Sequence, residues 1–317
     1  MTEALLESAA CPLGCAPDDK EVLQAPDRLN GLPGTFRVVR CGHCGLMRTD
    51  PRPSPQNMAH YYPADYGPYE GTRVREAVPV ARSRWKQRLG PWVRRIFDLR
   101  TNHLPGLHPG HMLEIGCASG AFLHRMAAQG WQVQGIEFSS AAAQAAIQAG
   151  YKVHAGALET APTPSSRFNL IVGWMVLEHL HDPVAGLRKL RAWAHPDAAL
   201  VLSVPNAGAL EFVLFRQRWY ALQLPTHLYH FTPGTIREIL EAGGWELEKV
   251  HHQRVLSNLV ASLGYLMQDR GHLRLARRLI EFPERAGRLM DILFPLAWIL
   301  SLFGQTGRMT IWAKVRP

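Results

Sequence analysis

The stretch HMLEIGCASG, residues 111–120, most constrains the fold, because an apolar run ends in a turn that contains Gly116 and Gly120. A strand that feeds such a turn and then a helix brings backbone N–H groups to a ligand, and the glycines let the ligand approach closely. The dinucleotide pattern G-x-G-x-x-G is incomplete, since Ala118 stands at the middle glycine position. The next apolar run, QVQGIE, ends in Glu137 about twenty residues later, where an acid can bind both hydroxyls of a ribose. The two features together predict a nucleotide-like ligand.

Short apolar runs alternate with helical patterns from residue 111 to the end of the chain. Such alternation is typical of a parallel sheet with helices on both of its faces. The last two apolar runs are separated by residues 257–305, which are rich in Leu and Arg and are expected to form a helical insertion. The pattern predicts strands at 111–115, 132–137, 152–154, 168–174, 199–204, 245–253 and 308–315, and helices at 121–129, 140–148, 183–194 and 233–242.

Four of the five cysteines lie in residues 1–60, which end in the proline-rich PRPSP and are predicted to form a separate module. Disulfides are rare in cytosolic proteins, so the two cysteine pairs are better explained as metal ligands. Four thiolates fill the tetrahedral shell of Zn²⁺ and leave no open position, which predicts a structural zinc site. His43 is an alternative ligand if one of the first two cysteines points away. The expected zinc ligands are Cys11, Cys15, Cys41 and Cys44.

The chain carries a formal charge of +9 and has a sequence pI near 9.6. This charge favours an anionic partner, such as nucleic acid, a phosphorylated substrate or an acidic membrane surface. Residues 61–105 are predicted to be a basic helical connector, since residues 72–100 hold nine Arg and Lys against two acids. No apolar run reaches about 18 residues, and the N-terminus lacks the features of a signal peptide, so a cytoplasmic protein is expected.

The segment ILFPLAWILSLF, residues 292–303, is too short to span a bilayer but is apolar on nearly every face. Because basic stretches accompany it, the segment is expected to lie on an anionic membrane surface, which would place the protein peripherally on the inner face of the membrane. A buried helix of the insertion and a dimer contact are the alternatives. The sequence does not predict the oligomeric state.

The segments EIGCASG, GIE, FNLIVGWMVLEHLHDP and LVLSVPN occur in this order between residues 111 and 250. Together they resemble the class I S-adenosylmethionine-dependent methyltransferases. The resemblance implies an α/β fold whose Rossmann-like seven-stranded sheet, in residues 106–317, ends in a hairpin with an antiparallel strand inside the sheet. The stretch RCGHCGLMRTDPRPSPQNMAHYY resembles the N-terminal zinc-ribbon-like module of a bacterial subgroup associated with sugar, polysaccharide and antibiotic pathways.

The resemblance implies S-adenosylmethionine as the cofactor. In the family the glycine turn borders the amino-acid end of the cofactor and the acid after the second strand binds its ribose, so the turn and Glu137 are expected to grip opposite ends of the molecule. Cys117 is expected to serve as a small turn residue, because nothing near it in sequence indicates an activated thiolate. The implied cofactor-binding residues are Glu114, Gly116, Cys117, Ala118, Gly120, Glu137, Phe138, Ala157, Leu158 and Trp174.

The methyl acceptor is expected at the carboxyl ends of the parallel strands, where ligands of such sheets bind. A histidine there can act as general base for a hydroxyl acceptor, and a capping or packing role is the alternative for each. Glu178 is expected to brace its loop or the cofactor end rather than to abstract a proton, and no ligand spacing in the sequence supports a metal bound by Glu178 and these histidines. In the loop 205–232, Arg216, Arg218 and Trp219 suit a phosphorylated sugar or a stacked ring, with an aromatic lid packed on its own loop as the alternative. The candidate bases are His179, His227 and His230.

The sequence thus predicts an S-adenosylmethionine-dependent methyltransferase that acts on a sugar, glycan or lipid-linked intermediate, with O-methylation favoured. The alternatives are an RNA methyltransferase and a non-catalytic protein that binds the cofactor. Nucleic acid is the less favoured partner, because GWMVLEH occupies the place of the Asn/Asp-Pro-Pro-aromatic signature of adenine- and cytosine-methylating enzymes. A nicotinamide oxidoreductase is favoured least, since its sheet has no need of a closing antiparallel strand.

Overall fold

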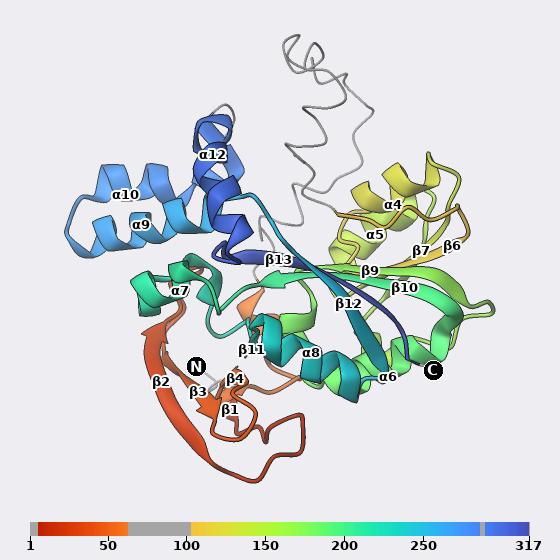
Figure 1. The fold of residues 1–317 in the computed structure, drawn as a ribbon, viewed down its shortest axis with the longest axis horizontal. Helices are drawn as coiled ribbons and strands as arrows, with labels where there is room; N and C mark the ends of the chain where they lie inside the picture. Colours follow the sequence, from red (N-terminus) through yellow and green to blue (C-terminus); the bar gives the residue numbers. More distant parts are fainter. Residues whose placement is uncertain (1–5, 63–102, 286–288, 317) are drawn as a thin grey trace.

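The computed structural model describes residues 6–62, 103–285 and 289–316. Its centre is a seven-stranded sheet with the strand order β12-β13-β10-β9-β6-β7-β8 (Figure 1). Strands β6 to β10 pair in parallel, whereas β13 runs antiparallel between β10 and β12. The predicted α/β fold and its mixed seven-stranded sheet are therefore confirmed. The strands are β6 (His111–Ile115), β7 (Gln132–Glu137), β8 (Lys152–Ala155), β9 (Phe168–Trp174), β10 (Ala194–Pro205), β12 (Trp245–His252) and β13 (Arg308–Val315).

Both faces of this sheet are buried. Along β6, Leu113 and Ile115 belong to the core on one face, and Met112 belongs to the core on the other, because successive side chains of a strand point to opposite faces. Burial on both faces explains why the central strand β9 and the second half of β10 are largely apolar, whereas the edge strand β8 is not. Two helices cover each face (Figure 1): α4 (Ala121–Ala127) and α5 (Ser140–Gln148) on one, α6 (Pro183–Trp193) and α8 (Pro233–Ala242) on the other.

Local chemistry fixes where α6 begins. The Asp182 carboxylate accepts a hydrogen bond from the Ala185 N–H at 2.8 Å, which satisfies one of the free amides of the first turn. Pro183 occupies the first helical position, where no N–H is needed. The loop between β9 and α6 is therefore held at the carboxyl end of the sheet, which is the edge where ligands of such folds bind.

The cysteine-bearing residues form a four-stranded sheet with the order β11-β4-β3-β2. Its fourth strand comes from far along the chain, since β11 pairs with β4 through Tyr229 opposite Arg48 and His230 opposite Met47. The N-terminal residues thus pack directly against the loop that follows β10. The strands are β2 (Asp19–Pro26), β3 (Thr35–Cys41), β4 (Met47–Thr49) and β11 (Tyr229–His230), and a separate pair joins β1 (Leu6–Glu7) to β5 (Arg52–Pro53).

Four helices lie between β12 and β13, in the range where the helical insertion was expected. In Figure 1 they stand together beside the sheet. Among the described residues, no helix combines the length and the apolar content that crossing a bilayer requires. The helices are α9 (Ser257–Asp269), α10 (Leu273–Ile280), α11 (Phe282–Arg285) and α12 (Leu289–Leu302).

The structure differs from the sequence-based elements mainly around β10. This strand begins at Ala194, five residues before the predicted start, and an irregularity between Ala194 and Ala199 shifts its pairing with β9. The short helix α7 (Leu210–Phe215) was not predicted, because six residues carry too little periodicity to reveal a helix. Of the predicted basic connector 61–105, residues 63–102 lie outside the described residues, so its helix stays a prediction.

Candidate active site

The turn after β6 contains three residues with positive φ: Gly116 at 67°, Ala118 at 45° and Gly120 at 86°. A Cβ atom on Gly116 would lie 2.4 Å from Cγ2 of Val176, so this position needs glycine for space as well as for its backbone angle. Ala118 adopts the left-handed region although it carries a methyl group. The turn therefore keeps its tight shape with an alanine in the middle.

The amides of this turn are bonded within the protein. The N–H groups of Gly116 and Cys117 both donate to the Ile136 carbonyl, at 2.8 and 3.2 Å, and the Gly120 N–H donates to the Cys117 carbonyl at 2.9 Å. The expectation that the turn offers free N–H groups is wrong for these three residues, because backbone carbonyls already satisfy them. Close approach, rather than hydrogen-bond donation, is what these positions offer to a ligand.

Glu137 ends β7 beside this turn. Its carboxylate accepts hydrogen bonds from the Ala118 N–H and the Ser139 N–H, each at 2.8 Å. Burial raises the pKa of Glu137, and the two backbone donors act against that shift by stabilising the charged form. The turn and Glu137 are thus in direct contact, and the expectation that they grip opposite ends of the cofactor stays a prediction. They form one continuous surface on which a ribose and its neighbouring atoms can lie.

Three of the implied cofactor residues point into the protein. Glu114, Cys117 and Leu158 are at most 4% exposed. The Cys117 sulfur packs over β7, where a Cβ on Gly135 would meet it at 2.6 Å, which agrees with its interpretation as a small turn residue. Burial raises the pKa of Glu114 well above its usual value. These side chains support the site from beneath.

Phe138, Ala157 and Trp174 lie nearer the surface. Phe138 is 46% exposed and directly follows Glu137, and Ala157, which precedes the 3-10 helix η2 (Leu158–Thr160), is partly buried. Trp174 at the end of β9 packs edge-on against Phe122, with ring centroids 5.2 Å apart. Its indole N–H is buried without a hydrogen-bond acceptor among the described residues, so it can donate to a ligand at this edge.

A second group of polar side chains lies after β9, on the 3-10 helix η3 (Leu177–His179). Glu178 is fully buried, and neither of its carboxylate oxygens has a hydrogen-bond partner among the described residues. Burial raises its pKa to about 8. The expected bracing role is therefore not supported by any hydrogen bond of this carboxylate within the described part of the chain.

Two of the three candidate bases meet beside Glu178. The rings of His179 and His227 lie edge to face with centroids 4.7 Å apart. The Nδ1 atom of His179 lies 2.9 Å from the Thr226 carbonyl, and that of His227 lies 2.8 Å from the Ala221 carbonyl. Burial lowers the pKa of His179 to about 4 and that of His227 well below its usual value, so both rings are neutral at pH 7.

His230, the third candidate base, stands apart from this pair. Its Nε2 atom lies 3.4 Å from Oγ1 of Thr49 in the N-terminal sheet, and burial lowers its pKa to about 3. With 2% of its surface exposed, His230 has the environment of a packing residue rather than that of a proton acceptor.

Tyr62 joins the cofactor side of the site to the histidine pair. Its hydroxyl lies 2.8 Å from Nδ1 of His179, and its ring lies 6.1 Å from the ring of Phe138. Phe138 is adjacent to Glu137 in sequence, so a chain of neighbours runs from Glu137 through Phe138 and Tyr62 to His179. The two groups of residues therefore border one site at the carboxyl edge of the sheet.

The loop after β10 follows the packing alternative that the sequence left open. Trp219 is 1% exposed and donates its indole N–H to Glu211 at 3.4 Å, so its ring is not available to stack on a ligand. Arg218 is paired with Asp269 in α9. Arg216 remains exposed at the end of α7, although its guanidinium also donates to the Val22 carbonyl at 2.8 Å.

The four N-terminal cysteines come together as predicted. Their sulfur atoms all lie within 4.8 Å of one another, and those of Cys11 and Cys44 are 3.6 Å apart. Sulfurs bound to one tetrahedral Zn²⁺ at 2.3 Å lie about 3.8 Å apart, so the observed separation fits such an ion. His43 is exposed and does not belong to the cluster, so the four sulfurs form the donor set.

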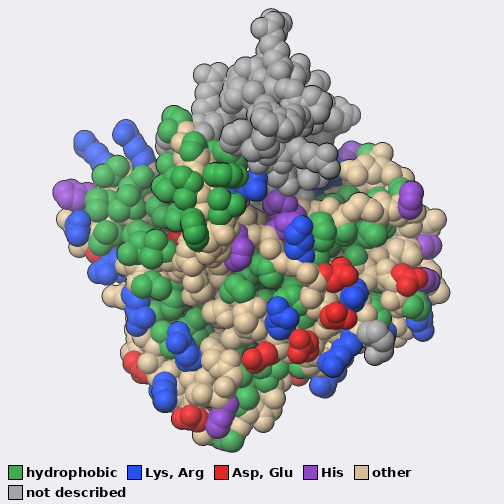
Figure 2. All heavy atoms as spheres, viewed as in Figure 1, with side chains coloured by type: hydrophobic (Ala, Val, Ile, Leu, Met, Phe, Trp, Pro, Cys, Tyr) green, Lys and Arg blue, Asp and Glu red, His purple; other side chains and the backbone are tan. Residues whose placement is uncertain are grey.

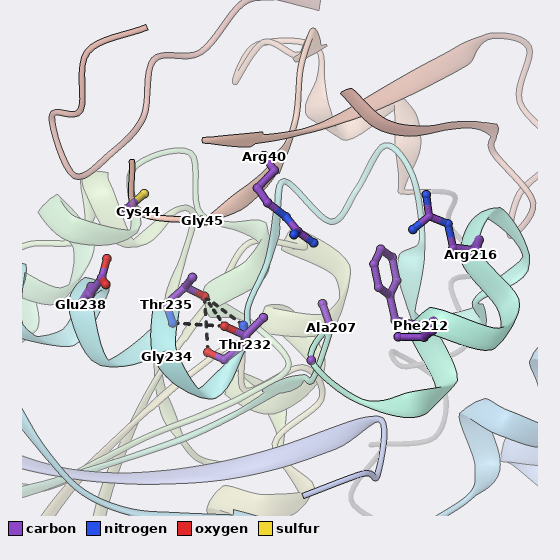
Figure 3. A pocket seen from close by; sticks show the side chains of 12 residues that line it. Arg40, Cys44, Gly45, Ala207, Phe212, Arg216, Thr232, Gly234, Thr235 and Glu238 are labelled. Carbon is purple, nitrogen blue, oxygen red and sulfur yellow. Dashed lines mark hydrogen bonds between the residues drawn. The ribbon is translucent and has the colours of Figure 1, made fainter. Parts of the chain in front are cut away.

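A hollow of about 500 Å³ lies between the N-terminal sheet and helices α7 and α8 (Figure 3). Arg40 reaches into it from β3, and Phe212 and Arg216 approach from the α7 side. No residue of the cofactor turn and none of the candidate bases lines it. The hollow is therefore separate from the candidate active site, and its two arginines favour an anionic occupant.

Comparison with known proteins identifies the family of this chain. Residues 83–250, just over half of the chain, match the family model described as "Methyltransferase domain", and the chain belongs to this family. It is 32% identical over 135 residues to the ubiquinone biosynthesis O-methyltransferase of Aromatoleum aromaticum. The aligned segment covers 39% of this chain and 58% of that protein. The same protein of Xanthomonas euvesicatoria is 28% identical over 153 residues, which covers 44% of this chain and 64% of the relative.

The matched part of the chain thus spans little more than half the length of these curated relatives. Among solved structures, an S-adenosylmethionine dependent methyltransferase from Mesorhizobium loti is similar with a TM-score of 0.43 and 16% identity, over 67% of this chain and 93% of the other. The cyclopropane synthase MmaA2 from Mycobacterium tuberculosis is similar with a TM-score of 0.43 and 19% identity, over 67% and 80%.

Proposed function

We propose that this protein transfers a methyl group from S-adenosylmethionine to a hydroxyl group of a small molecule. The contact of Glu137 with the turn at Ala118 carries this proposal, because it places a buried acid and a tight, small-residue turn side by side at the carboxyl edge of the sheet. Membership of the methyltransferase-domain family supports methyl transfer. The O-methyltransferase names of the similar proteins support a hydroxyl acceptor.

The cofactor would lie across the turn and Glu137. The Glu137 carboxylate would accept hydrogen bonds from the ribose hydroxyls, and the exposed ring of Phe138 would cover part of the nucleoside. The sulfonium would then face the end of β9, where Trp174 and η3 lie. In the transfer itself, the bond from the methyl carbon to sulfur breaks as the bond to the acceptor oxygen forms, and the electron pair stays on sulfur.

His179 is the best placed of the three candidate bases, because it is only partly buried and its neighbours Tyr62 and Thr226 fix its ring. Its pKa of about 4 keeps it neutral and able to accept a proton. The same low pKa makes it a weak base, since general bases work best with a pKa near the working pH. The chemistry therefore favours an acceptor hydroxyl that is acidic or that is activated by a further group.

We further propose a phosphorylated or lipid-linked sugar as the acceptor. The resemblance of the cysteine-bearing residues to modules of sugar-pathway enzymes supports this class. A zinc ion in the Cys11, Cys15, Cys41 and Cys44 cluster would hold these residues in place.

An assay with methyl-deuterated S-adenosylmethionine tests the activity. The protein is incubated with nucleotide sugars in one set and with phenols in another, and products are detected by the mass of the labelled methyl group. Labelled nucleotide sugar that disappears with Glu137→Ala supports the proposal, whereas labelled phenol alone overturns the sugar acceptor. Tight cofactor binding with no labelled product in either set indicates a non-catalytic binding protein.

Helix α12 also supports peripheral contact with an anionic membrane, which we propose as part of this function. Ile292 and Phe303 are each 72% exposed, and Leu302 is 60% exposed. Figure 2 shows hydrophobic side chains gathered at α12 with basic side chains beyond them, and α10 contributes Arg277, whose side chain is 80% exposed. Apolar and basic side chains side by side are typical of a helix that lies in the membrane interface.

Vesicle flotation tests this contact. The wild type should float with vesicles that contain anionic lipid and remain in solution with zwitterionic vesicles, and Ile292→Ser with Phe303→Ser should stay in solution with both. Exposed Leu273 in α10 offers a matched control, since Leu273→Ser removes similar apolar area outside α12. Equal flotation of the wild type and the α12 variant would exclude this face as the contact.

A further inference from the structure

Three side chains with metal-binding atoms converge after β9, outside the cysteine cluster. A carboxylate oxygen of Glu178 and one ring nitrogen each of His179 and His227 lie within 4.8 Å of one another. Donor atoms about 2.1 Å from one tetrahedral ion lie about 3.4 Å apart, so small side-chain rotations can bring all three onto a shared ion. Two of the donors are adjacent in sequence, and the third comes from a loop almost fifty residues away.

The hydrogen bonds of the two rings define which nitrogen is available. A carbonyl oxygen can only accept a hydrogen bond, so the contacts with Thr226 and Ala221 require the proton on Nδ1 of His179 and of His227. The lone pair of each neutral ring is then on Nε2. A backbone carbonyl that holds the opposite ring nitrogen is the usual arrangement around metal-binding histidines.

Glu178 is the buried side chain that most needs a binding partner. Its side chain is fully buried, and both oxygens lack a hydrogen-bond donor among the described residues. A buried carboxylate without donors is costly, and in proteins such groups are normally paired or bound to a metal. Arg308 is near enough for its charge to act on Glu178, but no ion pair joins these two described residues. Arg308 acts on Glu211 as well, and neither carboxylate forms an ion pair with it among the described residues.

We propose that Glu178, His179 and His227 bind a divalent transition-metal ion at the carboxyl edge of the sheet. Two imidazoles and one carboxylate suit ions such as Zn²⁺ or Fe²⁺, whereas Mg²⁺ and Ca²⁺ prefer oxygen ligands alone. Three protein ligands leave at least one position open, in contrast to the four sulfurs of the cysteine cluster. The ion is therefore able to bind a substrate atom.

The ion also has a role that rests on the proposed function. An acceptor hydroxyl in the open position would lose its proton to solvent more readily, because the cation stabilises the alkoxide. That oxygen would then form the new bond to the methyl carbon, and S-adenosylhomocysteine would leave with the electron pair on sulfur. The ion thus would supply the activation of the acceptor hydroxyl.

Titration of the full chain with Co²⁺ tests the site. Co²⁺ at the cysteine cluster shows thiolate charge-transfer bands, whereas Co²⁺ bound by Glu178, His179 and His227 shows d–d bands without them. The protein is first loaded with Zn²⁺ at the cysteines and treated briefly with a weak chelator. The wild type should bind one further equivalent of Co²⁺ with no thiolate charge-transfer band. Calorimetry should show that Glu178→Gln weakens this binding at least about tenfold, as the loss of a ligand requires.

His181→Gln is the matched control, since this half-buried histidine lies two residues from His179 and is bonded to the Pro53 carbonyl instead of the cluster. It should bind Co²⁺ like the wild type. His227→Gln provides a second loss variant should Glu178→Gln fail to fold, and circular dichroism checks the fold of each variant.

Two results would overturn the proposal. The first is that the zinc-loaded wild type binds no additional Co²⁺, or binds it only with thiolate charge-transfer bands. The second is equal Co²⁺ affinity in the wild type and in a folded Glu178→Gln or His227→Gln variant. The readout needs neither cofactor nor acceptor. A protein that binds this Co²⁺ but no S-adenosylmethionine would keep the metal site and overturn the proposed function. The converse result would leave the function standing without the ion.

Discussion

The turn after β6 and the cluster after β9 share one edge of the sheet, but they are assembled differently. The turn and Glu137 come from two neighbouring strands and lie within about twenty residues of each other, and hydrogen bonds between them complete the structure. The cluster combines Glu178, His179 and His227 with Thr49, whose hydroxyl donates to the His227 carbonyl at 2.7 Å. It therefore depends on three distant segments.

The two regions also differ in how their buried carboxylates are hydrogen-bonded. Glu137 has two backbone N–H donors, whereas Glu178 has no donor among the described residues. Burial raises the pKa of both, and at Glu137 the N–H groups of Ala118 and Ser139 oppose that shift, whereas at Glu178 no neighbouring residue within the described part of the chain donates to the carboxylate. The turn is complete as the protein folds, while the cluster needs a further partner.

The largest effect is expected when two of the cysteines are replaced, because this change should reduce methyl transfer but leave cofactor binding almost unaltered. Cys41→Ser with Cys44→Ser should remove about one equivalent of zinc and loosen β4, which carries Thr49 and pairs with β11 beside the histidines. Methyl transfer should fall by roughly a hundredfold, since small displacements at a reacting centre have such effects. Binding of S-adenosylhomocysteine should change little, because the turn and Glu137 are held by hydrogen bonds to each other and to Ile136. Equal losses in both measurements would show that the two regions fold as one unit.

The next effect tests the close packing of the turn. Gly116→Ala should lower the free energy of unfolding by about 2–5 kcal/mol, because its Cβ would overlap Val176 and its φ is positive. Gly150→Ala is the matched control, since φ is 92° there and a Cβ would meet nothing within 4 Å. Urea denaturation should therefore show a smaller loss for Gly150→Ala. Similar losses would mean that the backbone angle alone matters.

A third effect concerns Glu211, a buried carboxylate that has hydrogen-bond donors and lies on the same side of the site as Glu178, His179 and His227. It accepts from the Gly307 N–H at 3.2 Å and from Trp219, and burial raises its pKa to about 7. Between pH 4.5 and 7 the unfolded chain loses this proton while the folded chain keeps it, so the contribution of Glu211 to stability falls as the pH rises. Glu211→Gln removes this dependence.

Relative to the wild type, the Glu211→Gln variant should therefore gain about 2–3 kcal/mol between pH 5 and pH 8, at roughly 1.4 kcal/mol per unit of pKa difference. Urea denaturation at the two pH values measures the gain. A constant difference would show that Glu211 is already charged in the folded protein.

The smallest effect concerns Ala118. Its φ of 45° strains an alanine by about 1 kcal/mol, and glycine would relieve that strain while making the unfolded chain more flexible. Ala118→Gly should therefore change the free energy of unfolding by less than about 1 kcal/mol and preserve cofactor affinity. A marked loss of affinity would mean that the methyl group itself contacts the cofactor.

The turn could be found from sequence because its signals are local. Glycine spacing, an apolar run and an acid about twenty residues later follow from backbone geometry within one β-α-β unit. The seven strands could be predicted for the same reason, since buried parallel strands are short apolar runs with helices between them. The cysteine cluster followed from two short spacings, Cys11 to Cys15 and Cys41 to Cys44.

The cluster could be found only in part, because its properties come from tertiary packing. The sequence marked His179 and His227 but could not show that both rings meet Glu178, or that no donor reaches this carboxylate. It could not show that the amides of Gly116 and Cys117 are taken by the Ile136 carbonyl. Nor could it show that β11 joins the N-terminal sheet, since a two-residue strand has no period to detect.

Titration calorimetry with S-adenosylhomocysteine tests the central claim most directly, because it measures the cofactor site without any acceptor or metal. The wild type should bind one equivalent, and Glu137→Ala should bind about ten to a hundred times more weakly, as the loss of hydrogen bonds from a charged acceptor predicts. Unchanged affinity in Glu137→Ala, or heat only with a nicotinamide dinucleotide, would contradict the assignment of this turn and its carboxylate to S-adenosylmethionine.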